Sequence, residues 1–147
     1  MAIQSELLID SRVEEVSRAR KWLGDHAAAE GFSDGDVRKL GLVLSEACVN
    51  VIEHAYLGEA GNPIELQLSI DDESLRLTIR DTGARFELED YEPPDLDEPH
   101  EGGYGVFIMR SLMDEVSYST SGQQGTTLTL IKRRPVRHSQ GPIEGGP

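Results

Sequence analysis

Residues 42–56 read LVLSEACVNVIEHAY and place polar side chains in a run that is otherwise apolar. Glu46, Asn50 and His54 recur every fourth residue. On a helix that advances about 100° per residue, they form a stripe beside the apolar face. Asn is a poor mid-helix residue, because its side chain competes for backbone hydrogen bonds. The stripe is therefore either a solvated flank or a set of ligands beside the core.

The helix that carries this stripe is predicted to begin at Ser33 and to end near Tyr56 and Gly58. Its apolar face is formed by residues three or four positions apart: Val37, Leu40, Leu44, Ala47, Val51 and Ala55. The polar stripe and the apolar face together predict a helix that packs against the core with its apolar face. Its polar groups then lie along the edge of that face.

A shorter helix is predicted before it, ending at Gly31. Residues 11–14 read SRVE and have the form of a capping box. The apolar residues that follow at helical spacing are Val13, Val16, Ala19 or Arg20, Leu23 and Ala27. Residues 5–9 ahead of the helix are predicted to form a short edge strand.

After residue 63 the apolar period changes from helical spacing to two. Alternation over 64–70 and 75–80, around a turn at 71–74, predicts two antiparallel strands. Residues 105–113 predict a short helix, and 116–121 with 126–132 predict a second hairpin. The order of elements predicts an α+β fold: a two-layer sandwich with a mixed, mainly antiparallel sheet covered on one face by helices.

Length and charge limit the functions to consider. The 147 residues suit one domain, predicted over 1–133, and the Pro-, Gly- and Ser-rich residues 134–147 predict a disordered tail. The formal net charge of −13 argues against direct nucleic-acid binding and against binding to an anionic membrane surface. Cys48 is the single cysteine, so no disulfide framework is expected, and a buried inert thiol is predicted. With no signal peptide or long apolar run, we expect a soluble, cytoplasmic protein.

A second polar motif, Asp81-Thr82-Gly83, stands at the end of a predicted strand. It can be a plain strand-terminating turn, since Asp and Gly both favour turns. It also has the form of the aspartic protease signature, but those enzymes are nearly all β. In a nucleotide site, the Asp81 carboxylate would accept a hydrogen bond from the adenine amine, and Gly83 would let the backbone approach the ring.

A glycine-rich stretch, Gly102-Gly-Tyr-Gly105, leads directly into the predicted short helix. Glycines before a helix start can cradle a phosphate, because free backbone N–H groups and the helix dipole both point at it. They can equally be a flexible connection. The irregular acidic stretch 82–103 ahead of them is longer than most loops of compact domains, and such loops are often lids or linkers.

In this order the motifs resemble the GHKL ATPase superfamily, which includes gyrase, heat-shock chaperone ATPases and histidine kinases. The residues concerned are Glu46-x-x-x-Asn50-x-x-x-His54, Asp81-x-Gly83, Gly103-x-Gly105 and Gly125-Thr126-Thr127. Within the superfamily, residues 50–56 and 113–116 are most similar to the anti-sigma-factor serine/threonine kinases. The resemblance covers about residues 5–132 and implies the Bergerat-type ATP-binding fold.

The resemblance also implies roles for individual residues and two ligands, ATP and Mg²⁺. Asn50 would ligate the metal, and Glu46 would act as general base. His54 would line the nucleotide pocket or pack behind it, and Thr126 or Thr127 would lie near the adenine. The other implied nucleotide contacts are Asp81 and Gly83 at the adenine, and Gly103 and Gly105 at the phosphates. The resemblance leaves Arg85 and Arg110 as candidate cations for the phosphates.

Three functions are compatible with these motifs. The leading one is a protein serine/threonine kinase that phosphorylates a STAS-type antagonist, sequesters a sigma factor and acts as a homodimer. The alternative is a nucleotide-gated binding module with little chemistry, which has no need of a base at Glu46. The third is the ATPase domain of a histidine kinase. It is disfavoured because only one helix is predicted before the Glu46 helix, and His26 therefore lacks a partner helix.

Overall fold

The computed structural model describes residues 2–83, 104–120 and 125–134. Its elements are β1 (Ile3–Asp10), α1 (Val13–Ala29), α2 (Asp34–Asn50), the π-helical turn η1 (Val51–Ala55), β2 (Pro63–Ile70), β3 (Ser74–Asp81), α3 (Tyr104–Leu112), β4 (Glu115–Ser119) and β5 (Thr126–Arg133). The predicted order of helices and strands is confirmed. The expected lid over 84–103, with Gly103 and Arg85, lies outside the described residues, as does the expected tail from residue 135 on.

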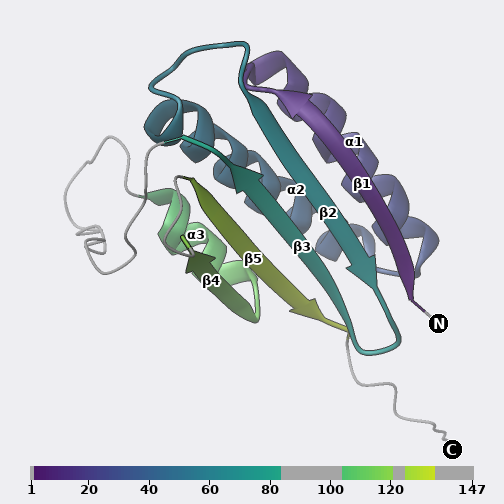
Figure 1. Cartoon of the computed structure of the whole chain (residues 1–147). Helices are drawn as coiled ribbons and strands as arrows, with labels where there is room; N and C mark the ends of the chain where they lie inside the picture. Colours follow the sequence, from purple (N-terminus) through teal and green to yellow (C-terminus); the bar gives the residue numbers. More distant parts are fainter. Residues whose placement is uncertain (1, 84–103, 121–124, 135–147) are drawn as a thin grey trace, which may run out of the picture.

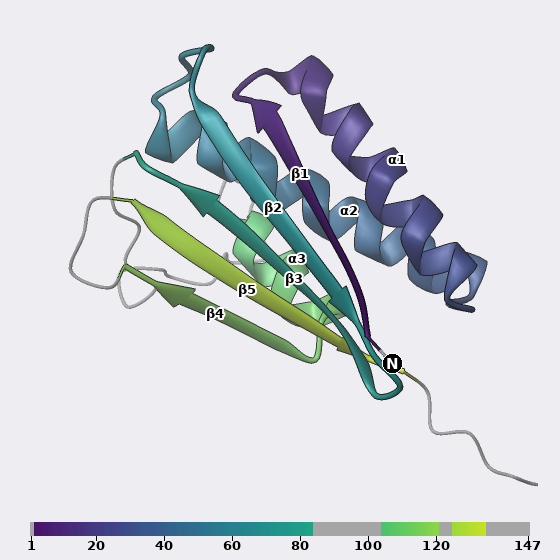
Figure 2. The same ribbon diagram turned by 45° about the vertical axis from the view of Figure 1, so that its right-hand side comes forward.

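The described strands form a five-stranded sheet in the order β1-β2-β3-β5-β4, and neighbouring strands are antiparallel. The described helices all cover the same face of this sheet, and no described helix lies on the opposite face (Figures 1 and 2). α2 packs between α1 and α3. The predicted α+β two-layer sandwich is therefore confirmed, and α2 is the central helix of its helical layer. The sheet was predicted to be mixed, but every pair of neighbouring strands in the described part of the chain is antiparallel.

Because side chains alternate between the two faces of a strand, every second side chain of β2 and β3 points into the core. Alternate residues of β2 and β3 are at most 2% exposed: Ile64, Leu66, Leu68, Ile70, Leu75, Leu77 and Ile79. Their partners from α2 include Leu40, Leu44 and Ala47. Cys48 is fully buried, which confirms the expected buried thiol, and burial raises the pKa of that thiol to about 12.

The two long helices start in different ways. Ser33 caps α2 as predicted, since its hydroxyl accepts a hydrogen bond from the Asp36 N–H at 3.1 Å. The capping box predicted at Ser11 is wrong: α1 has Arg12 at its N-cap and no side-chain cap. The Ser11 hydroxyl instead donates to the Glu59 carbonyl at 2.6 Å, because the 59–62 turn lies against the start of α1. Val13, expected on the apolar face, is 63% exposed.

The helix predicted to run to Tyr56 changes type at Asn50, where α2 ends and η1 begins. The N–H of Tyr56 donates to the carbonyl of Val51, five residues back, instead of four. Single π-helical turns of this kind are frequent at functional sites. Among the described residues, no helix has both the length and the apolar character needed to cross a membrane.

Candidate functional site

The ends of the Glu46 and Asn50 side chains meet at the first turn of α3. A methyl group placed on Gly105 would lie 3.0 Å from Asn50 Nδ2 and 3.2 Å from Glu46 Oε2. Both side chains are half-buried, and Gly105 is buried. The polar stripe of α2 is therefore not a freely solvated flank: a carboxylate and an amide one helical turn apart converge on the glycine that opens α3.

Asp81, at the end of β3, carries a carboxylate that is buried and held in place. The residue is 5% exposed, and its Oδ1 accepts the Gly83 N–H at 3.0 Å. Thr126, directly opposite in the β3–β5 pairing, also donates its backbone N–H to this carboxylate. Burial raises the pKa of Asp81, and these two N–H groups oppose that shift. The group is thus a fixed acceptor in an apolar setting.

Two glycines beside Asp81 are required by close packing. A side chain on Gly83 would overlap the carbonyl group of Ala55, the last residue of η1. A side chain on Gly125 would overlap the carbonyl oxygen of Asp81, and Gly125 also has a φ of +100°, which glycine adopts readily. The turn after β3 is therefore packed between the end of α2–η1 and the start of β5.

A small pocket of about 40 Å³ connects these elements between η1 and the sheet. It is lined by Ala47, Asn50, Val51, His54, Ala55, Ile79, Asp81, Tyr118, Thr126 and Leu128. The structure thus gathers Asn50, His54, Asp81 and Thr126 around one pocket, with His54 exposed at its rim. Arg110 lies in the last turn of α3, away from the Gly105 end.

Two residues, one lining the pocket and one near it, were not among the predicted site residues. Tyr118 of β4 lines the pocket opposite Leu128 of β5, and strand alternation alone assigns both to the inner face. Tyr56, just after η1, is 7% exposed, and its hydroxyl accepts the Thr82 N–H at 3.0 Å. The His54-Ala-Tyr56 sequence pointed to Tyr56. No periodicity, however, predicts that its hydroxyl contacts the turn after β3.

The described residues fit a nucleotide and Mg²⁺ in their donor chemistry. Mg²⁺ prefers hard oxygen ligands and keeps several waters, so an amide oxygen such as that of Asn50 can serve as a protein ligand. Asp81 offers a buried acceptor that matches an exocyclic amine. The missing side chain at Gly105 lets the first turn of α3 pack directly against the ends of Glu46 and Asn50.

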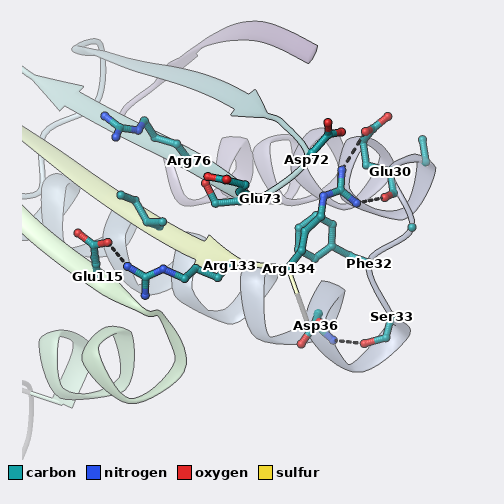
Figure 3. Close-up of a pocket in the computed structure, with 14 residues that line it drawn as sticks. Glu30, Phe32, Ser33, Asp36, Asp72, Glu73, Arg76, Glu115, Arg133 and Arg134 are labelled. Carbon is teal, nitrogen blue, oxygen red and sulfur yellow. Dashed lines mark hydrogen bonds and ion pairs between the residues drawn. The ribbon is translucent and has the colours of Figure 1, made fainter. Parts of the chain in front are cut away.

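A larger hollow of about 1220 Å³ lies at the other end of the sheet, between the α1–α2 turn and the β2–β3 turn (Figure 3). Two ion pairs join charged side chains that line it: Arg133 with Glu115, and Arg134 with Glu30. Arg134 also stacks over the Phe32 ring, 5.1 Å from its centroid, and donates to the Asp71 carbonyl at 2.9 Å. Arg134 thus connects the end of β5 to the α1–α2 turn and to the β2–β3 turn.

Replacing Arg134 with Ala is expected to lower the free energy of unfolding by about 2–4 kcal/mol. The side chain is 22% exposed, and its loss leaves the Glu30 and Asp71 carbonyls without their donor. Arg133→Ala is the matched control, because its ion pair is 57% and 52% exposed and should contribute less than about 1 kcal/mol. Urea denaturation measures the free energy of unfolding of both variants. Equal losses in the two would contradict the structural role assigned to Arg134.

Residues 9–132 match the family described as histidine kinase-like ATPase domain. A protein named serine-protein kinase RsbW from Oceanobacillus iheyensis is 30% identical over 135 residues, which cover 86% of this chain and 84% of that relative. The protein of the same name from Bacillus subtilis is 27% identical over 135 residues, 86% of this chain and 83% of the relative.

Two solved structures share the fold at 20% identity. The RsbU and RsbW domains of a Mycobacterium tuberculosis protein superpose with a TM-score of 0.64, over 92% of this chain and 33% of that one. The histidine kinase domain of a blue-light-activated kinase from Erythrobacter litoralis gives a TM-score of 0.53, over 82% of this chain and 59% of that one. The chain therefore spans only part of either protein.

Proposed function

The chain belongs to the histidine kinase-like ATPase family, and from this premise we propose that it is an ATP- and Mg²⁺-dependent serine/threonine-protein kinase of the anti-sigma type. The observation that carries the proposal is the meeting of Glu46, Asn50 and Gly105. A binding module needs an amide or a buried acceptor for its nucleotide, but it has no use for a carboxylate beside the phosphate site. That carboxylate favours a kinase.

In this proposal the two ends of the site have separate tasks. Asp81 accepts a hydrogen bond from the adenine amine, with Thr126 beside it and His54 at the rim of the pocket. Asn50 ligates Mg²⁺, which when bound neutralises charge on the phosphates. Gly105, and Gly103 from outside the described residues, supply backbone N–H groups to the phosphates.

Glu46 acts on the protein substrate. A serine hydroxyl of the partner attacks the γ-phosphorus, the new O–P bond forms, and the bond to the β-phosphate oxygen breaks so that ADP leaves. The proton of the hydroxyl passes to the Glu46 carboxylate. A serine hydroxyl is barely ionised at neutral pH, so this transfer can contribute roughly 10²–10⁴-fold to the rate.

The partners are part of the same proposal: a STAS-domain antagonist as phosphoryl acceptor and a sigma factor as the protein held inactive, at a cytoplasmic location. A homodimer through the β1 edge is constrained by the structure. Arg18 donates to the Leu8 carbonyl at 2.9 Å, and the Asp10 N–H donates to Glu15 at 3.2 Å. A second copy therefore has to pair with β1 ahead of Leu8.

The test is transfer of labelled phosphate from ATP to a purified STAS-type antagonist. Transfer to a serine or threonine of the antagonist is the expected result, and it should require Mg²⁺. ATP binding without any transfer would instead favour the nucleotide-gated binding module. No ATP binding at all would reject both functions.

The Asp81→Asn variant is expected to bind ATP more weakly by about 1–3 kcal/mol, because an amide can present a donor where the adenine amine needs an acceptor. Asp71→Asn is a matched control: Asp71 also accepts two backbone N–H groups, but in the β2–β3 turn at the far end of β3. Calorimetry measures both variants. Unchanged affinity in Asp81→Asn would remove adenine recognition from this residue.

A further inference from the structure

A buried tyrosine directly after η1 has no part in the reaction proposed above. The Tyr56 hydroxyl accepts the Thr82 N–H at 3.0 Å and donates to the Pro63 carbonyl. It also lies 3.3 Å from the Thr82 hydroxyl. This one group joins the end of η1, the first residue of β2 and the turn after β3, three segments that are separate in the sequence.

The turn that Tyr56 reaches is the one that carries the proposed adenine acceptor. Inside the turn, the N–H of Gly83 fixes the Asp81 carboxylate, and Thr126 fixes it from β5. Those bonds orient the carboxylate relative to the sheet. They do not set how far the turn stands from the helix that carries Asn50.

The distance between this turn and the helix that carries Asn50 is set by contacts from the helix. Gly83 packs directly against the Ala55 carbonyl, and the Tyr56 hydroxyl bonds the residue between Asp81 and Gly83. Both contacts start from the end of η1, at Ala55 and at Tyr56 directly after it, and η1 itself continues from Asn50. A nucleotide has a fixed length between base and phosphates, so the spacing of these two ends decides whether both can be engaged at once.

We propose that Tyr56 is a positioning residue for adenine recognition, whose hydroxyl holds the Asp81–Gly83 turn at the correct distance from the metal- and phosphate-binding end of α2. The inference rests on the proposed function, because it assumes that Asp81 reads the adenine. Tyr56 touches no nucleotide in this assignment and acts through the turn alone.

Tyr56→Phe keeps the buried ring and removes the hydroxyl. The Thr82 N–H and the Pro63 carbonyl then lose their partner, and the turn is free to shift toward other donors and acceptors. ATP affinity is expected to fall about 5- to 20-fold. GTP presents a carbonyl oxygen where ATP presents its amine, so it gains nothing from Asp81. Its affinity should not change.

The readout is the ratio of the ATP and GTP dissociation constants, measured by competition against a labelled ATP analogue, beside the thermal midpoint. Ser11→Ala is the matched control: its hydroxyl is as buried, at 2% exposed, and bonds Glu59 and Asn62 of the neighbouring turn. It should lower the midpoint and leave the ratio unchanged. A merely structural role for Tyr56 predicts the same pattern in Tyr56→Phe, and that result would overturn the proposal.

The wild-type protein provides a second measurement in case Tyr56→Phe does not fold. Hydrogen exchange at the Thr82 amide should be slow and should slow further with ATP but not with GTP. Fast exchange at Thr82 would overturn the positioning role. If wild type binds ATP and phosphorylates the antagonist while the ratio in Tyr56→Phe equals that of wild type, only this inference fails. If wild type binds no ATP, the proposed function fails with it.

Discussion

Glu46→Gln is expected to bind ATP-Mg²⁺ nearly as wild type does and to transfer phosphate roughly 10²–10⁴-fold more slowly. Gln has the size and nearly the helix propensity of Glu, so α2 should be undisturbed. It lacks the carboxylate that would take the serine proton. Because Glu46 Oε2 lies beside Gly105 and not at the Asp81 end, nucleotide recognition should be spared.

The measurement is single-turnover transfer of labelled phosphate to the antagonist, beside nucleotide affinity. Glu53→Gln is the matched control, since Glu53 is an exposed carboxylate of η1, and it should transfer phosphate at the wild-type rate. Transfer at the wild-type rate in Glu46→Gln would show that the base is assigned wrongly. Loss of affinity in parallel with the rate would place Glu46 in nucleotide binding instead.

The layout of the fold could be predicted from periodicity. The alternation of Ile64 to Ile70 and the helical spacing of Leu40, Leu44 and Ala47 report burial directly, because half of a strand and one side of a helix must be apolar to pack. The cap at Ser33 is equally local: a hydroxyl and an N–H three residues apart meet as soon as the helix forms.

Local patterns failed where a tertiary contact competed for the same group. Ser11 had the sequence of a capping box, but its hydroxyl bonds the 59–62 turn, which lies 48 residues away at Glu59. At Gly83 the structure shows a contact that the sequence did not predict, because a side chain there would overlap the Ala55 carbonyl. Both partners are set by the pairing of the α and β layers, which no short window of sequence contains.

The π-helical turn shows the same limit for the candidate site. The stripe Glu46, Asn50 and His54 was predicted with one regular twist, which is correct as far as Asn50. Beyond it, η1 changes the twist, so that His54 stands at the pocket rim and Tyr56 turns into the core. The widened turn includes the hydrogen bond from the Tyr56 N–H to the Val51 carbonyl, and hydrophobic spacing does not distinguish such a turn from an α-turn.

Asn50→Ala is expected to lose both Mg²⁺-dependent ATP affinity and phosphoryl transfer while the protein becomes no less stable. A protein-bound metal supplies several kcal/mol of charge stabilisation, so transfer should fall by at least about a hundredfold when its ligand is removed. Ala is a better helix former than Asn by roughly half a kcal/mol, and Asn50 is only half-buried. The thermal midpoint should therefore stay level or rise, as is common where a side chain serves function at a cost in stability.

Three measurements separate the causes: the thermal midpoint, ATP affinity with Mg²⁺, and ATP affinity with EDTA. Loss of affinity with Mg²⁺ only, at an unchanged or higher midpoint, is the expected pattern. Equal loss with and without Mg²⁺ would mean that Asn50 binds the nucleotide itself. A lower midpoint would mean that its amide supports the contact with Gly105, and the metal would then have to be held by other residues.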